Sequence, residues 1–251
     1  MHPVLFEIGP FTVYSYGFMI AIAFALSAFL MWRKAPSIGF PQEKVIDFLT
    51  VILISGVLGA RLLHVSLNWD YYSKNLLEII LIQKGGLAFY GGLILAVPAA
   101  MIFLLRNGIA IEKGGDLMAP FLALGQGLGR IGCFLNGCCY GVVMDDRLPG
   151  VIFPGESCTR FPTQIVSTLG LIFIYVVLRA MLEKGVLRNR LFYAYLIFYS
   201  VLRFFVEFFR GDVAHATFGM TVSQVICIGI FIGGAAAMIL RSFVWKSSSS
   251  K

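Results

Sequence analysis

The chain has 251 residues, of which 59% are hydrophobic and only 13% are charged, and its mean hydropathy is +0.86. A soluble globular domain carries about a quarter charged residues, so this composition excludes an ordinary soluble protein and indicates repeated membrane crossing. The net charge is +7, but lysines and arginines gather in short segments between apolar runs, where they set membrane orientation. We therefore expect no nucleic-acid partner.

Seven apolar runs follow one another, each close to the about 20 residues that a membrane-spanning helix needs. They cover residues 13–31, 45–67, 86–105, 116–135, 163–182, 191–209 and 221–240. Residues 1–12 form a flanking segment, and residues 241–251 form a basic, Ser-rich tail. The pattern predicts an all-α integral membrane protein, a bundle of about seven transmembrane helices in which residues 1–251 form a single transmembrane domain.

Lysine and arginine are unevenly distributed among the segments between the runs. The segments after the first, third, fifth and seventh runs contain Arg33, Lys34, Lys44, Arg106, Lys113, Lys184, Arg188, Arg190, Arg241, Lys246 and Lys251, whereas the others contain Lys74, Lys84, Arg147, Arg160 and Arg210. Because cytoplasmic loops are enriched in these residues, we expect the N-terminus and its flanking segment outside, and the C-terminus and its tail in the cytoplasm.

Arg61, Arg130, Arg203 and Glu207 are ionisable residues that lie late in their apolar runs. In the expected orientation all four lie toward the outer leaflet. A charge within the membrane is costly, so it usually faces a protein interior or a wet cavity and marks a functional site. The sequence predicts a polar site that opens to the outer face.

Arg203, Glu207 and Arg210 are spaced four and three residues apart, so they share one helix face. One interpretation is a structural row of ion pairs near a helix C-terminus. The other is an anion site, since Arg61 and Arg130 add more positive charge than Glu207 neutralises. Guanidinium groups bind phosphate in a bidentate manner, and a phospholipid head group is the natural anion at that depth.

The segment 125–141, GQGLGRIGCFLNGCCYG, combines glycines with three cysteines. Glycines at this density favour close helix packing, and neither a P-loop nor a dinucleotide-binding pattern is present. Cys133, Cys138 and Cys139 lack the C-x2-C pairing of zinc sites and the three histidines are scattered, so we expect no metal. In an oxidising compartment, Cys158 is a possible disulfide partner for Cys138 or Cys139.

Two further groups of residues have open interpretations. Tyr16 and Tyr90 lie near predicted outer ends and are flanked by glycine, which leaves both an interfacial aromatic belt and a site role possible. Asp116 follows two glycines and is best interpreted as an N-terminal residue of its own helix.

The segment GRIGCFLNGCCYG resembles the signature G-R-x-G-N-F-x-N-x-E-x-x-G of the bacterial prolipoprotein diacylglyceryl transferase family. The resemblance extends in order over nearly the whole chain, through HPVLFEIGPFTVYSYGFMIA at 2–21, GARL at 59–62, GGLAFYGG at 85–92, DLMAP at 116–120, FPTQ at 161–164 and RFFVEFFR at 203–210. The chain is therefore identified as a divergent member of that family.

The resemblance implies seven helices in the bacterial cytoplasmic (inner) membrane and no cofactor. It implies transfer of a diacylglyceryl group from phosphatidylglycerol to the lipobox cysteine thiol of a preprolipoprotein signal peptide, with formation of a thioether and release of glycerol phosphate. Matched positions give the catalytic residues Arg130, Arg203 and Glu207, and the substrate-binding residues Tyr16, Asn136 and Gly141. We add Tyr90, at the position of a family histidine, as a candidate catalytic residue, and Arg61 and Arg210 as candidate substrate-binding cations.

The chain departs from the family pattern at acid and base positions. Tyr90 stands where the family's F-H-G-G motif has histidine, and Cys133 and Cys138 replace the signature's first Asn and its Glu. In H-P-S/T-Q-L-Y-E, the residues are Phe161, Val166 and Ser167 instead of His, Tyr and Glu. The base is open between Tyr90 and Glu207.

Two other functions stay open at this stage. One is a lipid-binding membrane protein or transporter that keeps the arginine cluster without catalysis. The other is a phospholipid group transferase with a different acceptor.

Overall fold

The structure, a computed structural model, describes residues 2–9, 11–82, 85–145, 150–153, 157–211 and 219–249. The chain divides into two compact units: unit 1 comprises Met1–Met31 and Gly115–Lys251, and unit 2 comprises Trp32–Gly114. The single-domain organisation stays a prediction. Lys84, Arg147 and Lys251, which contributed to the predicted orientation, lie outside the described residues.

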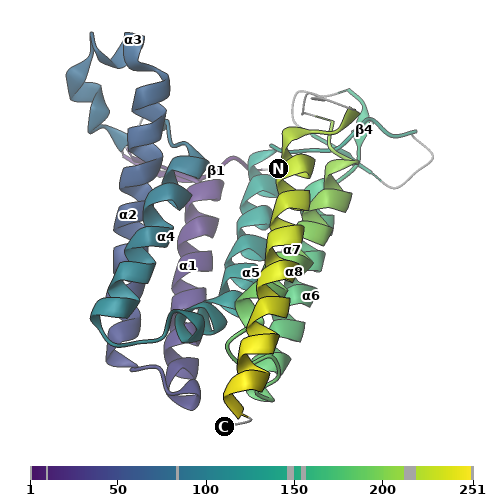
Figure 1. The fold of residues 1–251 in the computed structure, drawn as a ribbon. Coiled ribbons are helices and arrows are strands. Elements are labelled where there is room, and N and C mark those ends of the chain that lie inside the picture. The colour runs from purple at the N-terminus through teal and green to yellow at the C-terminus, as the bar shows by residue number, and fades with distance from the viewer. Residues whose placement is uncertain are drawn as a thin grey trace. The chain divides into compact units, whose positions relative to one another are not determined.

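Long helices occur at each of the seven predicted runs (Figure 1). They are α1 (Ser15–Lys34), α2 (Glu43–Leu67), α4 (Phe89–Arg106), α5 (Ile111–Asn136), α6 (Thr163–Glu183), α7 (Leu191–Glu207) and α8 (Val222–Ser249). Short helical segments are η1 (Ala35–Ile38), α3 (Trp69–Tyr72) and η2 (Leu76–Ile79). The largest boundary differences are at α8, which ends nine residues after the predicted residue 240 (249 − 240 = 9), and at α5, which begins five residues before the predicted residue 116 (116 − 111 = 5).

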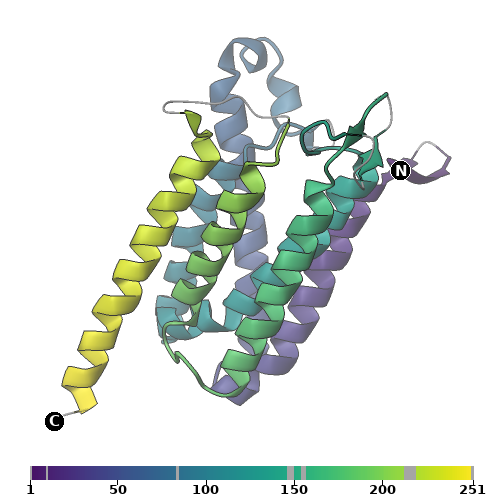
Figure 2. The same cartoon turned by 90° about the vertical axis from the view of Figure 1, so that its right-hand side faces the viewer.

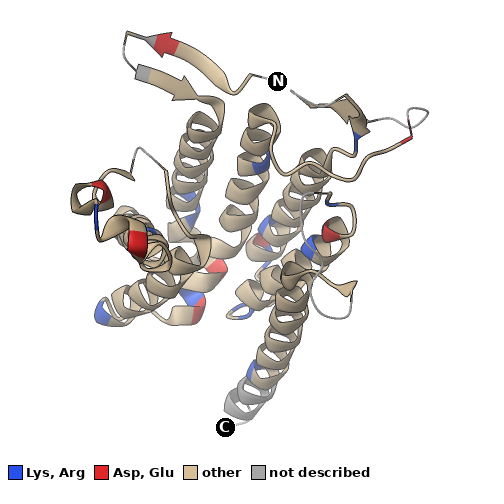
Figure 3. Cartoon of the chain, turned by 90° about the horizontal axis from the view of Figure 1, so that it is seen from above, with Lys and Arg blue, Asp and Glu red and all other residues tan. Residues whose placement is uncertain are grey.

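Six of the described helices, α1, α2, α4, α5, α6 and α8, are long and apolar enough to cross a membrane. Figure 3 shows that charged residues are sparse along the helices. The 17 residues of α7 reach about 26 Å at about 1.5 Å per residue, less than the about 30 Å of a hydrocarbon core. The chain is a multi-pass membrane protein, and the count of seven spans stays a prediction.

Two short antiparallel sheets accompany the helices. The predicted flanking segment folds into a hairpin of β1 (Val4–Ile8) and β2 (Phe11–Tyr14), and β3 (Val151–Ile152) pairs with β4 (Thr159–Arg160). The backbone N–H of Ser15 donates to the carbonyl of Pro3 at 2.9 Å, which ties the hairpin to the start of α1. The all-α prediction missed both sheets, because each is too short to give a pattern.

The five long helices of unit 1 alternate in direction. The N- and C-terminal ends of the unit lie at opposite ends of this bundle (Figures 1 and 2). The last turns of α5 and α7 therefore lie at the same end as the first turns of α1, α6 and α8, together with the connection between α5 and α6. This end carries the site described below.

Helix α5 packs closely against its neighbours in unit 1 through glycines. A Cβ atom added at Gly132 would lie 3.0 Å from Cβ of Met19 on α1, and one at Gly127 would lie 3.3 Å from Cβ of Leu171 on α6. Larger residues would push the helices apart. The structure thus supports the interpretation of these glycines as packing residues.

Asp116 caps a helix other than its own. It is buried in α5, and its carboxylate accepts hydrogen bonds from the backbone N–H groups of Asn189, Leu191 (2.8 Å) and Phe192 (3.3 Å). These are donors at the start of α7, which the helix leaves without intrahelical partners. The prediction that Asp116 begins its own helix was wrong, because α5 starts at Ile111.

In unit 2, α2 and α4 meet at a pair of glycines. A Cβ atom at Gly59 would lie 2.3 Å from the carbonyl oxygen of Gly91, and a Cβ atom at Gly91 would lie 2.3 Å from the carbonyl oxygen of Gly59. The backbones approach so closely that neither position accommodates a side chain.

We therefore expect Gly59→Ala to destabilise the protein by about 2 kcal/mol, as overpacking of a tight contact typically does. The measurement is thermal unfolding of the purified protein in detergent. Gly56→Ala, one turn away on α2, is the matched control, since its Cβ would meet only Cβ of Ala96 at 3.8 Å. Equal stability of the two variants would contradict the assigned contact.

Candidate functional site

A buried carboxylate organises the end of α7. The Glu207 side chain is 0% exposed, and its Oε2 lies 2.6 Å from Nη2 of Arg203 and 3.9 Å from Nη1 of Arg210. Its other oxygen, Oε1, accepts a hydrogen bond from Oγ1 of Thr221 at 3.0 Å. The shared face predicted from the spacing is confirmed, and both oxygens of the carboxylate are engaged.

Thr221 belongs to a capping arrangement at the start of α8. The backbone N–H of Gln224 donates to Thr221 Oγ1 at 3.3 Å, and Gln224 Oε1 accepts from the backbone N–H of Thr221 at 2.9 Å. This reciprocal pair is a capping box. It fixes the threonine hydroxyl, which in turn fixes Glu207. We had not predicted this role, although the sequence signal, T-x-x-Q before an apolar run, was available.

The arginines exceed what Glu207 neutralises. Nη1 of Arg203 is buried and has no hydrogen-bond acceptor among the described residues, a costly situation for a charged donor. Arg130 and Arg210 both interact electrostatically with Arg203. Within the described part of the chain, no hydrogen bond or ion pair is found for Arg130. Arg130 and Arg210 thus add positive charge beside the Arg203–Glu207 pair, which favours binding of an anion.

The end of α5 turns the chain back on itself. Gly137 adopts a left-handed conformation with φ 74°, and its N–H donates to the carbonyl of Phe134 at 3.1 Å. The N–H of Cys138 donates to the carbonyl of Cys133 at 3.1 Å. These two bonds form a Schellman motif, which places Cys138 beside Cys133.

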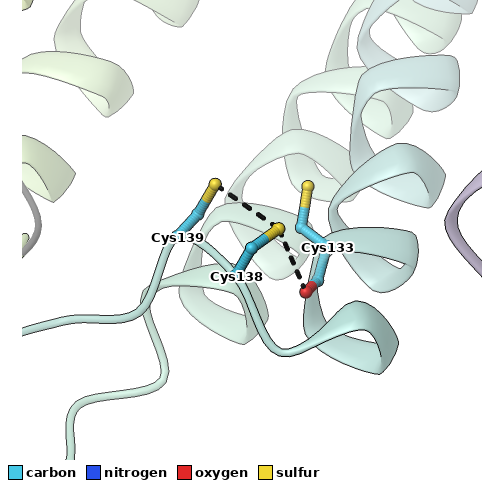
Figure 4. Close-up of side chains that lie close together, drawn as sticks. All are labelled: Cys133, Cys138 and Cys139. Atoms are coloured by element: carbon cyan, nitrogen blue, oxygen red, sulfur yellow. Dashed lines mark hydrogen bonds between the residues drawn. The ribbon is translucent and has the colours of Figure 1, made fainter. Parts of the chain in front are cut away.

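The three cysteines of the segment form a thiol cluster (Figure 4). The sulfur atoms of Cys133, Cys138 and Cys139 all lie within 4.8 Å of one another, and those of Cys138 and Cys139 are 3.8 Å apart. Cys138 and Cys139 are free thiols. The disulfide to Cys158 that the sequence left open is therefore not formed in the structure.

The start of α6 holds the backbone of this cluster. Thr163 Oγ1 donates to the carbonyl of Cys139 at 2.6 Å, and Gln164 Nε2 donates to the carbonyl of Cys138 at 2.7 Å. Both donors belong to the FPTQ segment, which the sequence singled out. The sequence did not reveal that these side chains hold the backbone of the thiol cluster.

The thiol of Cys138 has a pKa well below its ordinary value. The largest cause is a hydrogen bond with the Cys133 thiol, followed by one with Cys139, and the Asn136 side chain and the positive charge of Arg130 add to the effect. Hydrogen bonds to a charged form stabilise it. Asn136, the last residue of α5, thus lies against the sulfur of Cys138, which follows the helix.

Gly141 connects the loop to the end of α7. It forms an isolated bridge with Arg210, and its N–H donates to the carbonyl of Phe161 at 2.9 Å. A Cβ atom there would lie 2.6 Å from the carbonyl oxygens of both Phe161 and Phe209. Gly141 is thus closely packed and sets the backbone beside Arg210, and its role in substrate binding stays a prediction.

Tyr16, at the start of α1, lies close to the end of α5. A Cβ atom at Gly132 would lie 3.4 Å from Cδ2 of Tyr16, and Tyr16 interacts electrostatically with Arg130 and with the thiol cluster. Unit 1 thus carries at one end the predicted residues Tyr16, Arg130, Asn136, Gly141, Arg203, Glu207 and Arg210.

Arg61, in unit 2, is bonded to the main chain of a loop in the same unit. It is buried, and its guanidinium group donates to the carbonyls of Ile79 (2.8 Å), Gly85 (2.7 Å), Gly86 (2.9 Å) and Glu78. Four of its five N–H groups are thus taken by the main chain. Arg61 anchors this loop to α2, and its assignment as a substrate-binding residue stays a prediction.

Tyr90 also belongs to unit 2. It is the second residue of α4, is 51% exposed and contacts the ring of Phe89 edge-on at 5.8 Å between centroids. Its hydroxyl has no hydrogen-bond partner among the described residues. Its role as a base stays a prediction.

The fold and the site define a class of protein: a multi-pass membrane protein with a cluster of arginines at one end of a helical unit. The profile of a family described as prolipoprotein diacylglyceryl transferase matches residues 3–240. The chain belongs to this family.

Relatives in the genus Bacillus carry the corresponding name. A phosphatidylglycerol–prolipoprotein diacylglyceryl transferase of Bacillus cereus (strain B4264) is 34% identical over 247 residues, which cover 95% of this chain and 91% of the relative. One of Bacillus anthracis is 33% identical with the same coverage.

Replacing Glu207 tests the buried ion pair. We expect Glu207→Gln to lower stability by about 3 kcal/mol, because it leaves Arg203 as an uncompensated buried charge. The matched control is Glu183→Gln, which breaks the Arg179–Glu183 pair with the same spacing on α6 but at an exposed position, 31% and 49% exposed, where the loss is about 0.5 kcal/mol. Thermal unfolding in detergent measures both. A loss for Glu207→Gln as small as that for Glu183→Gln would contradict the assignment.

The lowered pKa of Cys138 predicts its reactivity. At a pH of about 6, far below the usual thiol pKa of about 8.5, Cys138 still carries thiolate, the reactive form. We expect iodoacetamide to modify Cys138 faster than Cys158 at this pH, as measured by mass spectrometry of digested protein. If the two cysteines lost reactivity in parallel as the pH fell, the shift would be excluded.

Proposed function

We propose that this chain transfers a diacylglyceryl group from phosphatidylglycerol to the cysteine thiol of a prolipoprotein, the reaction named for its relatives. One observation carries the proposal: Arg203, paired with the carboxylate of Glu207, also interacts electrostatically with Arg130 and Arg210, and one of its buried guanidinium nitrogens has no acceptor among the described residues. The phosphodiester of phosphatidylglycerol has the charge and the oxygens that such a group binds.

Arg130 and Arg203 bind the phosphodiester, and Arg210 adds positive charge beside them. Attack of the acceptor sulfur on the glyceryl carbon breaks the bond between that carbon and the phosphate oxygen. The electron pair stays on the phosphate, so negative charge grows on the leaving glycerol phosphate. Guanidinium groups already in place stabilise that charge in the transition state more than in the ground state.

Glu207 positions Arg203 in this scheme. Its two oxygens already interact with Arg203 and Thr221, and a carboxylate held in this way is a weak base. Its contribution is to fix the orientation of the guanidinium group.

The acceptor is the lipobox cysteine of a preprolipoprotein signal peptide, and the protein lies in the bacterial cytoplasmic (inner) membrane with its N-terminus outside. The charge distribution of the connecting segments supports this orientation. The arrangement of unit 1 agrees with it, since the arginine site lies at the same end of the bundle as the N-terminal hairpin.

The test is to incubate the purified protein with phosphatidylglycerol and a lipobox peptide, and to measure the diacylglyceryl mass increment on the peptide cysteine. We expect Arg130→Ala and Arg203→Ala each to reduce the transfer rate by about 100-fold or more, as loss of one charge-stabilising donor does. Arg179→Ala, which removes a half-buried arginine from α6, serves as the control with unchanged transfer.

Transfer that survives both arginine substitutions would contradict the proposed mechanism. Binding of phosphatidylglycerol without any transfer, under conditions in which an authentic enzyme works, would instead favour a lipid-binding protein.

A further inference from the structure

The thiol cluster has the dimensions of a metal site. Zinc binds thiolate sulfur at about 2.3 Å in a tetrahedral arrangement, which places two sulfur ligands about 3.8 Å apart. The sulfur atoms of Cys138 and Cys139 are 3.8 Å apart, and all three lie within 4.8 Å of one another. The remaining adjustment is at most about 1 Å, within reach of rotation about a cysteine Cα–Cβ bond.

The backbone conformation explains how the three cysteines come together although the sequence lacks a C-x2-C pair. The Schellman motif brings residue 138 back to residue 133, five positions earlier. Cys139 then adopts φ 63°, a left-handed conformation that non-glycine residues rarely take. We expected no metal because a C-x2-C pair is missing and the histidines are scattered, and neither observation reveals this turn.

The cluster is also held in place from outside. Thr163 and Gln164 donate side-chain hydrogen bonds to the carbonyls of Cys139 and Cys138. Supporting bonds of this kind fix the positions of metal-ligating side chains. A strained residue whose neighbours hold its backbone is a reasonable basis for a functional hypothesis.

Charge and ligand type agree on a soft metal ion. Three thiolates and one Zn²⁺ leave a net charge of −1, and Arg130 interacts electrostatically with Cys138. Among the described residues, Cys133, Cys138 and Cys139 form a group of potential metal ligands with donor atoms within 4.8 Å of one another. All three donor atoms are sulfur. Thiolates select zinc or Cu(I) over magnesium and calcium.

We propose that Cys133, Cys138 and Cys139 bind a zinc ion, and that the open fourth position of this ion takes the thiol of the acceptor cysteine. Three protein ligands with one open position are the pattern of catalytic zinc sites, whereas structural sites are closed by four. All three cysteines are partly exposed rather than buried, which leaves the ion accessible. The second half of the proposal rests on the proposed function.

Such an ion supplies what the missing family histidine and glutamate would otherwise provide. A thiol that coordinates zinc is deprotonated, and its proton passes to water. The zinc-bound sulfur then forms the bond to the glyceryl carbon while the bond from that carbon to the phosphate oxygen breaks. The electron pair leaves with glycerol phosphate, the thioether product dissociates, and zinc keeps its charge throughout.

The first experiment measures metal binding without any transfer. Reduced, metal-free protein is titrated with zinc in competition with a chromophoric chelator. We expect about one equivalent bound by the wild type, about one by the Cys158→Ser/Cys227→Ser control, and none by Cys133→Ser/Cys138→Ser/Cys139→Ser. Absence of stoichiometric binding by the wild type, or unchanged binding by the triple variant, overturns the proposal.

Two measurements on the wild type remain decisive if the triple variant fails to fold. Bound zinc should slow alkylation of Cys133, Cys138 and Cys139 at least 10-fold while leaving Cys158 unchanged, as measured by mass spectrometry. Cobalt(II) in place of zinc should give thiolate-to-metal charge-transfer absorption. Unprotected thiols, or cobalt bound without this absorption, would exclude the site.

The second experiment tests the open position. A lipobox peptide is added to the cobalt-loaded protein in the absence of phosphatidylglycerol. We expect additional charge-transfer absorption with the cysteine peptide and none with a serine peptide. If the absorption does not change with the cysteine peptide, the proposed role of the metal in acceptor binding is overturned. Failure of the proposed function is detected separately. It would appear as absence of transfer with phosphatidylglycerol in both the zinc-loaded and the metal-free protein.

Discussion

The site depends on one interaction, the burial of the Glu207 carboxylate between Arg203 and Thr221. An unpaired charge at this depth would be strongly destabilising, so each of the three groups is required by the others. The threonine is fixed by the cap of α8, and Arg203 rises from the preceding turn of α7. The ion pair thereby holds a guanidinium group in place and leaves part of its hydrogen-bonding capacity for a ligand.

The helices and the arginine site could be predicted because both follow from simple rules. Membrane spans need long apolar runs, and residues three or four positions apart share a helix face, so α7 and the grouping of Arg203, Glu207 and Arg210 are readable from the sequence. Arg61 was not predictable in the same way. Its guanidinium group is of the type that binds phosphate, but its N–H groups donate to main-chain carbonyls 18 or more residues away in the chain.

The thiol cluster shows a further limit. Spacing rules for metal sites describe tight turns, and they miss a pair of cysteines that a helix cap brings together across five positions. The glycine at position 137 is the signal that could have revealed it, since glycine after the last helical residue indicates a left-handed cap. The short sheets were missed for another reason, because strands of two to five residues carry too little pattern to distinguish them from loops.

Asp116 gives the site a remote determinant. It joins α5 to the first residues of α7, 14 residues before Arg130 on α5 (130 − 116 = 14), which corresponds to about 21 Å of helix. Because helices are stiff over this length, fixing their far ends also limits how much the two arginine-bearing ends can separate or slide. The separation of the two arginine-bearing helix ends is thus set partly by a carboxylate near the opposite end of unit 1.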